Sequence, residues 1–95
     1  MLLETIGQSP NFEAIFGVRA EHRLEQIRSR SGAGARRRTV WEHEEYDRDG
    51  HLVARYEAFQ EIEPETGAAR SGWTKYDRDG WVVDEGRITR NIAAV

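Results

Sequence analysis

A five-residue segment that occurs twice decides the expected fold of this chain. Thirty residues separate its two copies, which read Tyr46-Asp47-Arg48-Asp49-Gly50 and Tyr76-Asp77-Arg78-Asp79-Gly80. Asp at the first and third turn positions, followed by Gly, is typical of a tight turn that ends in a left-handed residue. Each copy has a Trp upstream and two apolar residues downstream. Each copy therefore predicts a β-hairpin.

Tight turns at these positions also predict which residues face one another across the strands. The expected pairs are Tyr46 with Leu52, His43 with Arg55, Trp41 with Glu57, Tyr76 with Val82 and Trp73 with Glu85. Residues 63–67, which include Pro64 and Gly67, supply a turn between the hairpins. We therefore expect a four-stranded antiparallel meander with strands near 38–46, 51–61, 69–76 and 81–89.

The N-terminal segment predicts a helix. Ser9 and Pro10 suit the N-cap and the first helical position. Apolar residues then recur at spacings of three and four, at Phe12, Ile15, Phe16, Ala20, Leu24 and Ile27. This stripe predicts a helix that runs to about Arg28. Gly17 interrupts it, and the alternative is a break at Gly17 followed by a second short helix.

Residues 29–38 predict a flexible Arg-rich connector, because they contain two Gly, lack apolar periodicity and end in three Arg. We expect one small domain over residues 1–95. Its parts are a helical segment (1–28), the connector (29–38), the β-meander (39–89) and a tail (90–95). The expected fold class is α+β, with the N-terminal helix packed on a curved four-stranded antiparallel β-meander of two repeated hairpins.

Strand alternation leaves apolar residues on both faces of the expected sheet. One face carries Val40, Tyr46, Leu52, Ala54 and Tyr56, and the other carries Trp41, Val53 and Phe59. Because neither face is cleanly polar, we expect another surface to cover part of each. The helix can cover one face, and sheet curvature, the tail or another chain can close the second.

Both turn segments resemble YD-type repeats, the Tyr-Asp-x-x-Gly hairpins of large β-shell proteins. The resemblance covers residues 46–52 and 76–82. It departs from the pattern directly after each Gly, where His51 and Trp81 stand in place of a basic residue. The resemblance implies hairpins, and two copies are too few to build a shell.

Composition narrows the class of protein. The 95 residues include no Cys, so there is no disulfide framework, thiolate metal site or Cys nucleophile. This composition fits a reducing compartment, and we expect a cytoplasmic protein. No apolar run reaches the ~18 to 20 residues of a membrane span, and the first residues lack a signal-peptide pattern. We therefore expect no membrane insertion.

The acidic turns also resemble the end of a Ca²⁺-binding loop, in which alternate carboxylates and a Gly surround the cation. Two residues before the first Asp of each turn, the chain has Glu45 in one copy and Lys75 in the other. With the remaining ligands missing, we expect turns, and neither a metal nor a cofactor.

His43 is the strongest catalytic candidate, because it shares a strand face with Trp41 and Glu45. A His among surface carboxylates is usually a solvated polar residue, and neither a second His at ligand spacing nor an activated nucleophile accompanies it. We therefore expect no enzyme. A small-ligand-binding or enzymatic barrel, with His43 and Glu residues lining its pocket, is an alternative.

A basic cluster at Arg36, Arg37 and Arg38, together with strand aromatics, favours an RNA-binding or regulatory nucleic-acid module as another alternative. Residues 1–40 carry a net charge of +3, whereas residues 41–95 carry −6. The expected strands bear carboxylates that would repel a phosphate backbone, at Glu42, Glu44, Glu45, Glu57, Asp84 and Glu85. Nucleic acid is therefore the less favoured partner.

The favoured function is a small non-enzymatic protein-interaction module, acting as an adaptor or accessory subunit of a larger assembly. Trp81 directly follows a turn Gly, where side chains tend to be exposed, and we expect it to form a contact patch with Trp73 or Phe59. The Arg-rich connector would serve as an electrostatic handle. The partner is another protein or a second copy of the chain in a homodimer.

Overall fold

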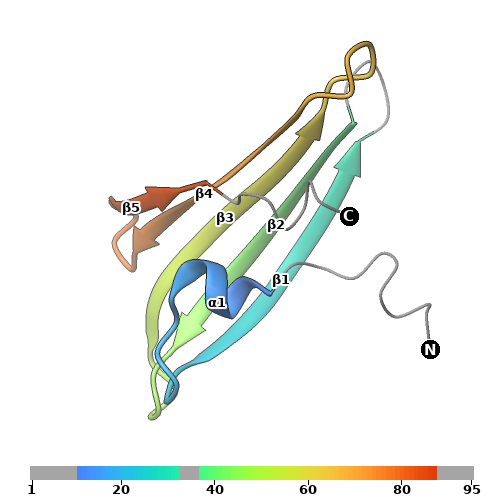
Figure 1. The fold of residues 1–95 in the computed structure, drawn as a ribbon. Coiled ribbons are helices and arrows are strands. Elements are labelled where there is room, and N and C mark those ends of the chain that lie inside the picture. The colour runs from blue at the N-terminus through green and yellow to red at the C-terminus, as the bar shows by residue number, and fades with distance from the viewer. Residues whose placement is uncertain (1–10, 33–36, 88–95) are drawn as a thin grey trace, which may run out of the picture.

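The described part of the chain forms one antiparallel sheet with a short helix. The computed structural model describes residues 11–32 and 37–87. Their elements are α1 (Phe12–Phe16), β1 (Arg23–Gly32), β2 (Arg37–Tyr46), β3 (Leu52–Ile62), β4 (Ala69–Asp77) and β5 (Val82–Gly86). The strands lie side by side in chain order, each antiparallel to the next (Figure 1). The antiparallel meander is confirmed, with five strands where four were expected.

The helix is shorter than predicted because Gly17 ends it. The Asn11 side chain caps its start and accepts a hydrogen bond from the Ala14 N–H at 3.3 Å. Gly17 then adopts a left-handed conformation with φ of 71°, which strains any residue that has a Cβ. The prediction of one helix to Arg28 is wrong. The break at Gly17 is confirmed, but the second short helix of that alternative is wrong, because Leu24 and Ile27 lie in a strand. Ser9, the expected N-cap, lies outside the described residues.

Residues 23–32 form β1, where the sequence suggested helix and connector. β1 pairs with β2 from Arg23 opposite Tyr46 to Gly32 opposite Arg38, and its register shifts between Gln26 and Arg28. Ile27 is the extra residue of this bulge; Leu24 packs against the core, whereas Ile27 is exposed. Of the expected connector, residues 29–32 belong to β1 and residues 37–38 to β2. Residues 33–36 and 90–95 lie outside the described part.

Both repeated hairpins are confirmed by their turn hydrogen bonds. In the first, Asp47 N–H donates to His51 O at 2.9 Å, and in the second Asp77 N–H donates to Trp81 O at 2.8 Å. The Gly that closes each turn has a left-handed φ, 87° in one copy and 94° in the other. The turn between the hairpins is confirmed at residues 63–67 as well, where Gly67 N–H donates to Glu63 O at 2.7 Å.

A bulge beside each turn shifts the register by one residue. Tyr46 opposite Leu52 and Tyr76 opposite Val82 are confirmed, and the shift follows directly after each pair. Upstream of the bulges the observed pairs are His43 with Tyr56, Trp41 with Ala58 and Trp73 with Gly86. The predicted partners Arg55, Glu57 and Glu85 are therefore wrong, because the prediction assumed two regular ladders.

The shifted register gathers the buried residues on one side of the sheet, which we call the helix face. It carries Trp41, His43, Glu45, Ala54, Tyr56 and Ala58, all buried. α1 lies over this face (Figure 1), where the Phe16 ring stacks on Tyr56 with centroids 4.0 Å apart and Phe12 meets Trp41 at 5.2 Å. The predicted division, with Trp41 and Tyr56 on opposite faces, is wrong because of the bulge.

The opposite side, which we call the charged face, alternates Arg and Glu across neighbouring strands. It carries Arg28, Arg30, Arg38, Glu42, Glu44, Arg55, Glu57 and Glu61. Ion pairs join Arg30 to Glu42 at 3.4 Å and Arg55 to Glu44 at 3.5 Å. The Arg38 guanidinium also lies over the Phe59 ring, 4.6 Å from its centroid. Among the described residues, the long stems of these charged side chains therefore cover part of this face.

α1 is the one helix of the described residues. Within residues 11–32 and 37–87, no helix is long and apolar enough to cross a membrane.

Candidate functional site

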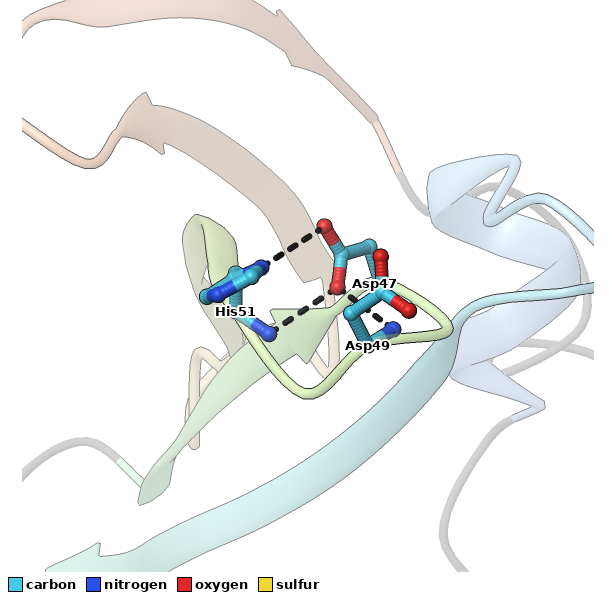
Figure 2. Close-up of side chains that lie close together, drawn as sticks. All are labelled: Asp47, Asp49 and His51. Carbon is cyan, nitrogen blue, oxygen red and sulfur yellow. Dashed lines mark hydrogen bonds and ion pairs between the residues drawn. The ribbon is translucent and has the colours of Figure 1, made fainter.

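Three side chains of the first turn, Asp47, Asp49 and His51, lie close enough together to hold a metal ion (Figure 2). Asp47 Oδ1 accepts the backbone N–H groups of Asp49 and His51, both at 2.9 Å. Asp47 Oδ2 lies 3.6 Å from His51 Nδ1. The His51 N–H lowers the pKa of Asp47, with a smaller contribution from the Asp49 N–H. The carboxylate is therefore engaged within its own turn.

The second turn repeats these bonds without an imidazole. Asp77 Oδ1 accepts the N–H groups of Asp79 at 2.9 Å and of Trp81 at 3.0 Å. Because the same carboxylate bonds form whether His or Trp follows the Gly, the first Asp of each copy acts as a turn-forming residue. The two turns border a common hollow of about 560 Å³, which is exposed to solvent and includes Arg78.

The helix face holds a buried carboxylate, Glu45, which is only 4% exposed and lies near the end of β2. Tyr56 O–H donates to Glu45 Oε1 at 2.6 Å, and His22 Nδ1 donates to Oε2 at 2.5 Å. Burial by itself would raise the pKa of Glu45, but the hydrogen bonds from His22 and Tyr56 outweigh burial and lower it. Both oxygens are occupied by internal donors, an arrangement that favours a structural role over proton transfer to a ligand.

Tyr56 is held in its neutral form by the same contact. Burial raises the pKa of Tyr56, and the hydrogen bond to Glu45 raises it further. The Lys75 ammonium lies 5.7 Å from the centroid of the Tyr56 ring. The sequence placed Glu45 and Tyr56 on neighbouring strands, but it offered no pattern that joins them to His22.

His43 is buried, 5% exposed, where a solvated residue was expected. Its ring contacts Phe12 at 4.5 Å and Phe16 at 5.7 Å between centroids, and Nδ1 has no hydrogen-bond partner among residues 11–32 and 37–87. Burial lowers the pKa of His43. The imidazole therefore packs as a neutral aromatic ring beneath α1, and its placement on the same face as Trp41 and Glu45 is confirmed.

A shallow groove of about 510 Å³ crosses the charged face. Strands β1 to β4 and the second turn line it, through Ile27, Arg28, Glu42, His43, Glu44, Arg55, Tyr56, Glu57, Tyr76 and Gly80. His43 and Tyr56 border the groove while their rings pack against α1. Among the described residues the sheet is open, with β1 and β5 at its two edges, so the groove is not the interior of a closed barrel.

Trp73 and Phe59, the two residues expected beside Trp81, lie on opposite faces of the sheet. Trp81 is 71% exposed, as expected. Trp73 is half-buried on the helix face, where its ring meets Phe16 with centroids 5.5 Å apart. Phe59 is half-buried on the charged face beneath Arg38. Adjacent residues of a strand point to opposite faces of the sheet. Trp73 pairs with Ala58 on the helix face, so the next pair, Phe59 with Gly72, lies on the charged face.

The predicted basic cluster is only partly described. Arg38 lies 3.8 Å from Glu61, which Arg70 approaches at the same distance. Arg37 is the first residue of β2, opposite Ile62, and its side chain is outside the described part, as is all of Arg36. Where Arg side chains of the charged face are described, carboxylates lie beside them, an arrangement that does not favour a phosphate backbone as partner.

Sequence reasoning missed the apolar residues beside Trp81. Val82 is 57% exposed and Val83 is 53% exposed, and both lie on β5, the edge strand. The doubled Val after the turn was the available signal, because two adjacent apolar residues break the alternation of a regular strand. Comparison with protein-family models, with curated proteins and with solved structures finds no significant match to this chain.

Proposed function

We propose that this protein is a small, non-enzymatic interaction module that binds another protein through the β5 edge of its sheet. The observation that carries the proposal is the run of three exposed apolar side chains, Trp81, Val82 and Val83, at this edge. Exposed Trp is enriched in binding hot spots, and an edge strand offers unpaired backbone groups to an added strand.

The other surfaces support this choice of site. The helix face is filled by α1, and the charged face is occupied by ion pairs such as Arg55 with Glu44. The buried Glu45 is saturated by His22 and Tyr56. An adaptor or accessory subunit needs a specific surface and no reacting group, which is the arrangement that the β5 edge offers.

Truncation of Trp81 tests the proposal. Tagged wild-type chain and Trp81→Ala are used to capture partners from the native cell after cross-linking, with quantification by mass spectrometry. We expect Trp81→Ala to reduce capture of specific partners about tenfold, the usual effect of losing an aromatic hot spot. Far-ultraviolet circular dichroism should be unchanged, because Trp81 makes little contact with the core.

The matched control is His51→Ala. His51 occupies the same position in the first turn, directly after its Gly, and its side chain is also exposed. This variant should capture partners as the wild type does. Equal capture by wild type and Trp81→Ala, with both chains folded, would contradict the proposal.

A further inference from the structure

The large apolar side chains that are exposed in the described residues all lie at the two free edges of the sheet. Trp81, Val82 and Val83 belong to the β5 edge, and Ile27, 44% exposed, belongs to β1. β1 and β5 are the outermost strands, so one side of each backbone faces no other strand of the described sheet. An exposed apolar edge is a template for pairing with another strand.

The two edges carry opposite charge. β1 contains Arg23, Arg28 and Arg30 against a single Glu25, whereas β5 contains Asp84 and Glu85 and no basic residue. Pairing of β5 with a second β5 would place carboxylates near carboxylates, which is unfavourable across strands. Pairing of β5 with β1 brings unlike charges together.

We propose that copies of this chain bind head to tail, with the β5 edge of one copy added to the β1 edge of the next. This inference rests on the proposed function and names its partner, a second copy of the same chain. The occupant of the β5 edge is then a strand that is both basic and partly apolar, as β1 is.

The topology sets the direction of this contact. Each of the four neighbouring strand pairs is antiparallel, so β1 and β5 run in the same direction. When two copies keep their charged faces on the same side, β5 of one copy therefore lies parallel to β1 of the next. β1, with ten residues, is long enough to pair along the whole of the five-residue β5.

One alignment satisfies both the charged and the apolar residues. Glu85 lies opposite Thr74, which lies opposite Glu57, so Glu85 is on the charged face together with Arg30. Glu85 and Arg30 are separated by fifty-five positions in sequence, as are Val82 and Ile27. A register that sets Glu85 beside Arg30 thus also sets Val82 beside Ile27.

A contact between two different edges leaves one edge free at each end of the pair. Such a heterologous interface adds further copies until it closes into a ring or forms a filament. This property distinguishes the proposed contact from a twofold dimer, in which the same edge of both copies is used up.

Two variants that block one edge each provide the test. Val82→Lys places a cation on the β5 edge, where it meets the basic β1, and Ile27→Lys interrupts the apolar part of the β1 edge. Glu65→Gln is the matched control, since it changes the net charge by the same amount at an exposed turn position. All chains are examined by sedimentation velocity from about 1 μM to about 1 mM.

Wild type and Glu65→Gln are expected to form larger species as concentration rises. Each Lys variant alone should raise the association midpoint at least about tenfold. An equimolar mixture of the two variants should form a one-to-one dimer, because Ile27→Lys keeps an intact β5 edge and Val82→Lys keeps an intact β1 edge. Circular dichroism checks that both variants remain folded.

Two results would overturn the inference. If Ile27→Lys alone associates as wild type does, β1 is not the partner edge. If wild type stays monomeric throughout, the partner is not a second copy. In the second case, capture of another protein that is lost in Trp81→Ala preserves the proposed function, whereas capture that is unaffected removes both proposals.

Discussion

The two hairpins of the sheet share a local structure but not an environment. In each, an Asp carboxylate accepts two backbone N–H groups of the turn, and a single Val is skipped in the strand pairing, Val53 in the first and Val83 in the second. Val53 packs against the core, whereas Val83 is exposed. The first hairpin joins the central strands β2 and β3, and the second joins β4 to the edge strand β5.

The residues that follow each bulge reflect this difference. After Val53 the chain places Ala54 and Tyr56 in the core, and the equivalent positions after Val83 are Asp84 and Gly86. The same turn chemistry can therefore build either a core element or an exposed edge. The outcome depends on whether the second strand of the hairpin has neighbouring strands on both sides, as β3 has, or on one side in the described sheet, as β5 has.

The largest difference between the hairpins is expected at the equivalent positions Tyr56 and Gly86. Tyr56→Ala should lower the free energy of unfolding by about 3 to 5 kcal/mol, because it leaves a cavity under Phe16 and removes a donor to Glu45. Gly86→Ala should lower it by about 1 to 3 kcal/mol, since its Cβ would lie 2.8 Å from Trp73 Cζ2. Urea unfolding measures both, and equal losses would contradict the comparison.

The two bulge residues should differ next. Val53→Lys should lower the free energy of unfolding by about 1 to 2 kcal/mol, because Val53 is partly buried against the core. Val83→Lys should change it by no more than about 0.5 kcal/mol, as is usual for an exposed position. Thermal unfolding of the two variants gives the measurement. A large loss in Val83→Lys would mean that the edge is part of the core.

Substitution of either turn glycine, in contrast, should lower the free energy of unfolding by the same amount, because the two turns have the same local structure. Gly50→Ala and Gly80→Ala should each lower the free energy of unfolding by about 1 kcal/mol, because both positions have a left-handed φ. Apart from the adjacent residues of the chain, no described atom lies within 4 Å of either added Cβ, so the loss comes from the backbone conformation. A clear difference between the two variants in urea unfolding would show that the turns are not equivalent.

The smallest expected effect is a pH dependence confined to the central hairpin. Burial lowers the pKa of His43, so the unfolded chain binds a proton near pH 6.5 while the folded chain does not. The free energy of unfolding should therefore fall as the pH drops below 6.5 towards the lowered pKa. The lowered pKa of Glu45 adds a second loss below its usual value of 4.5.

Urea unfolding of His43→Phe at about pH 7.5 and about pH 5.5 checks this prediction. The variant should lose part of the acid dependence that wild type has between these values. His51→Phe, at an exposed turn position of the same hairpin, is the control and should keep the wild-type dependence. An unchanged dependence in His43→Phe would show that this imidazole is not the group responsible.

The turns and the exposure of Trp81 could be predicted because they depend on neighbouring residues. Asp bonds to N–H groups two and four residues ahead, and Gly accepts a left-handed φ wherever the turn lies. The pairs next to the turns, Tyr46 with Leu52 and Tyr76 with Val82, were correct for the same reason. Such features do not require knowledge of distant contacts.

β1 could not be predicted in this way. Leu24 and Ile27 continue an apolar spacing that also suits a helix, and the Ser and Gly that follow resemble a linker. Their strand conformation depends on hydrogen bonds to β2, which lie outside any local window of sequence. Pairing with β2 therefore makes residues 23–32 a strand, although the spacing of their apolar residues also suits a helix.

The burial of His43 and Glu45 was missed for a different reason. One extra residue at Val53 reverses the faces of every position upstream, so Trp41 joins Tyr56 beneath α1. The carboxylate of Glu45 then meets Tyr56 and His22, so three separate parts of the chain come together. Because this one bulge was not predicted, the sequence indicated a polar surface where the structure has a buried cluster.

The order of amino acids by itself determined two hairpins and an exposed Trp81, since each follows from bonds and sterics within a few residues. It offered the helix stop at Gly17 only as an alternative. Only the tertiary structure decided that Arg23–Gly32 is a strand, that Glu45 is buried, and that β1 and β5 are edges of unlike charge. The physical reason is that burial, register and edges are properties of strands beside one another, and the pairing of strands distant in sequence creates them.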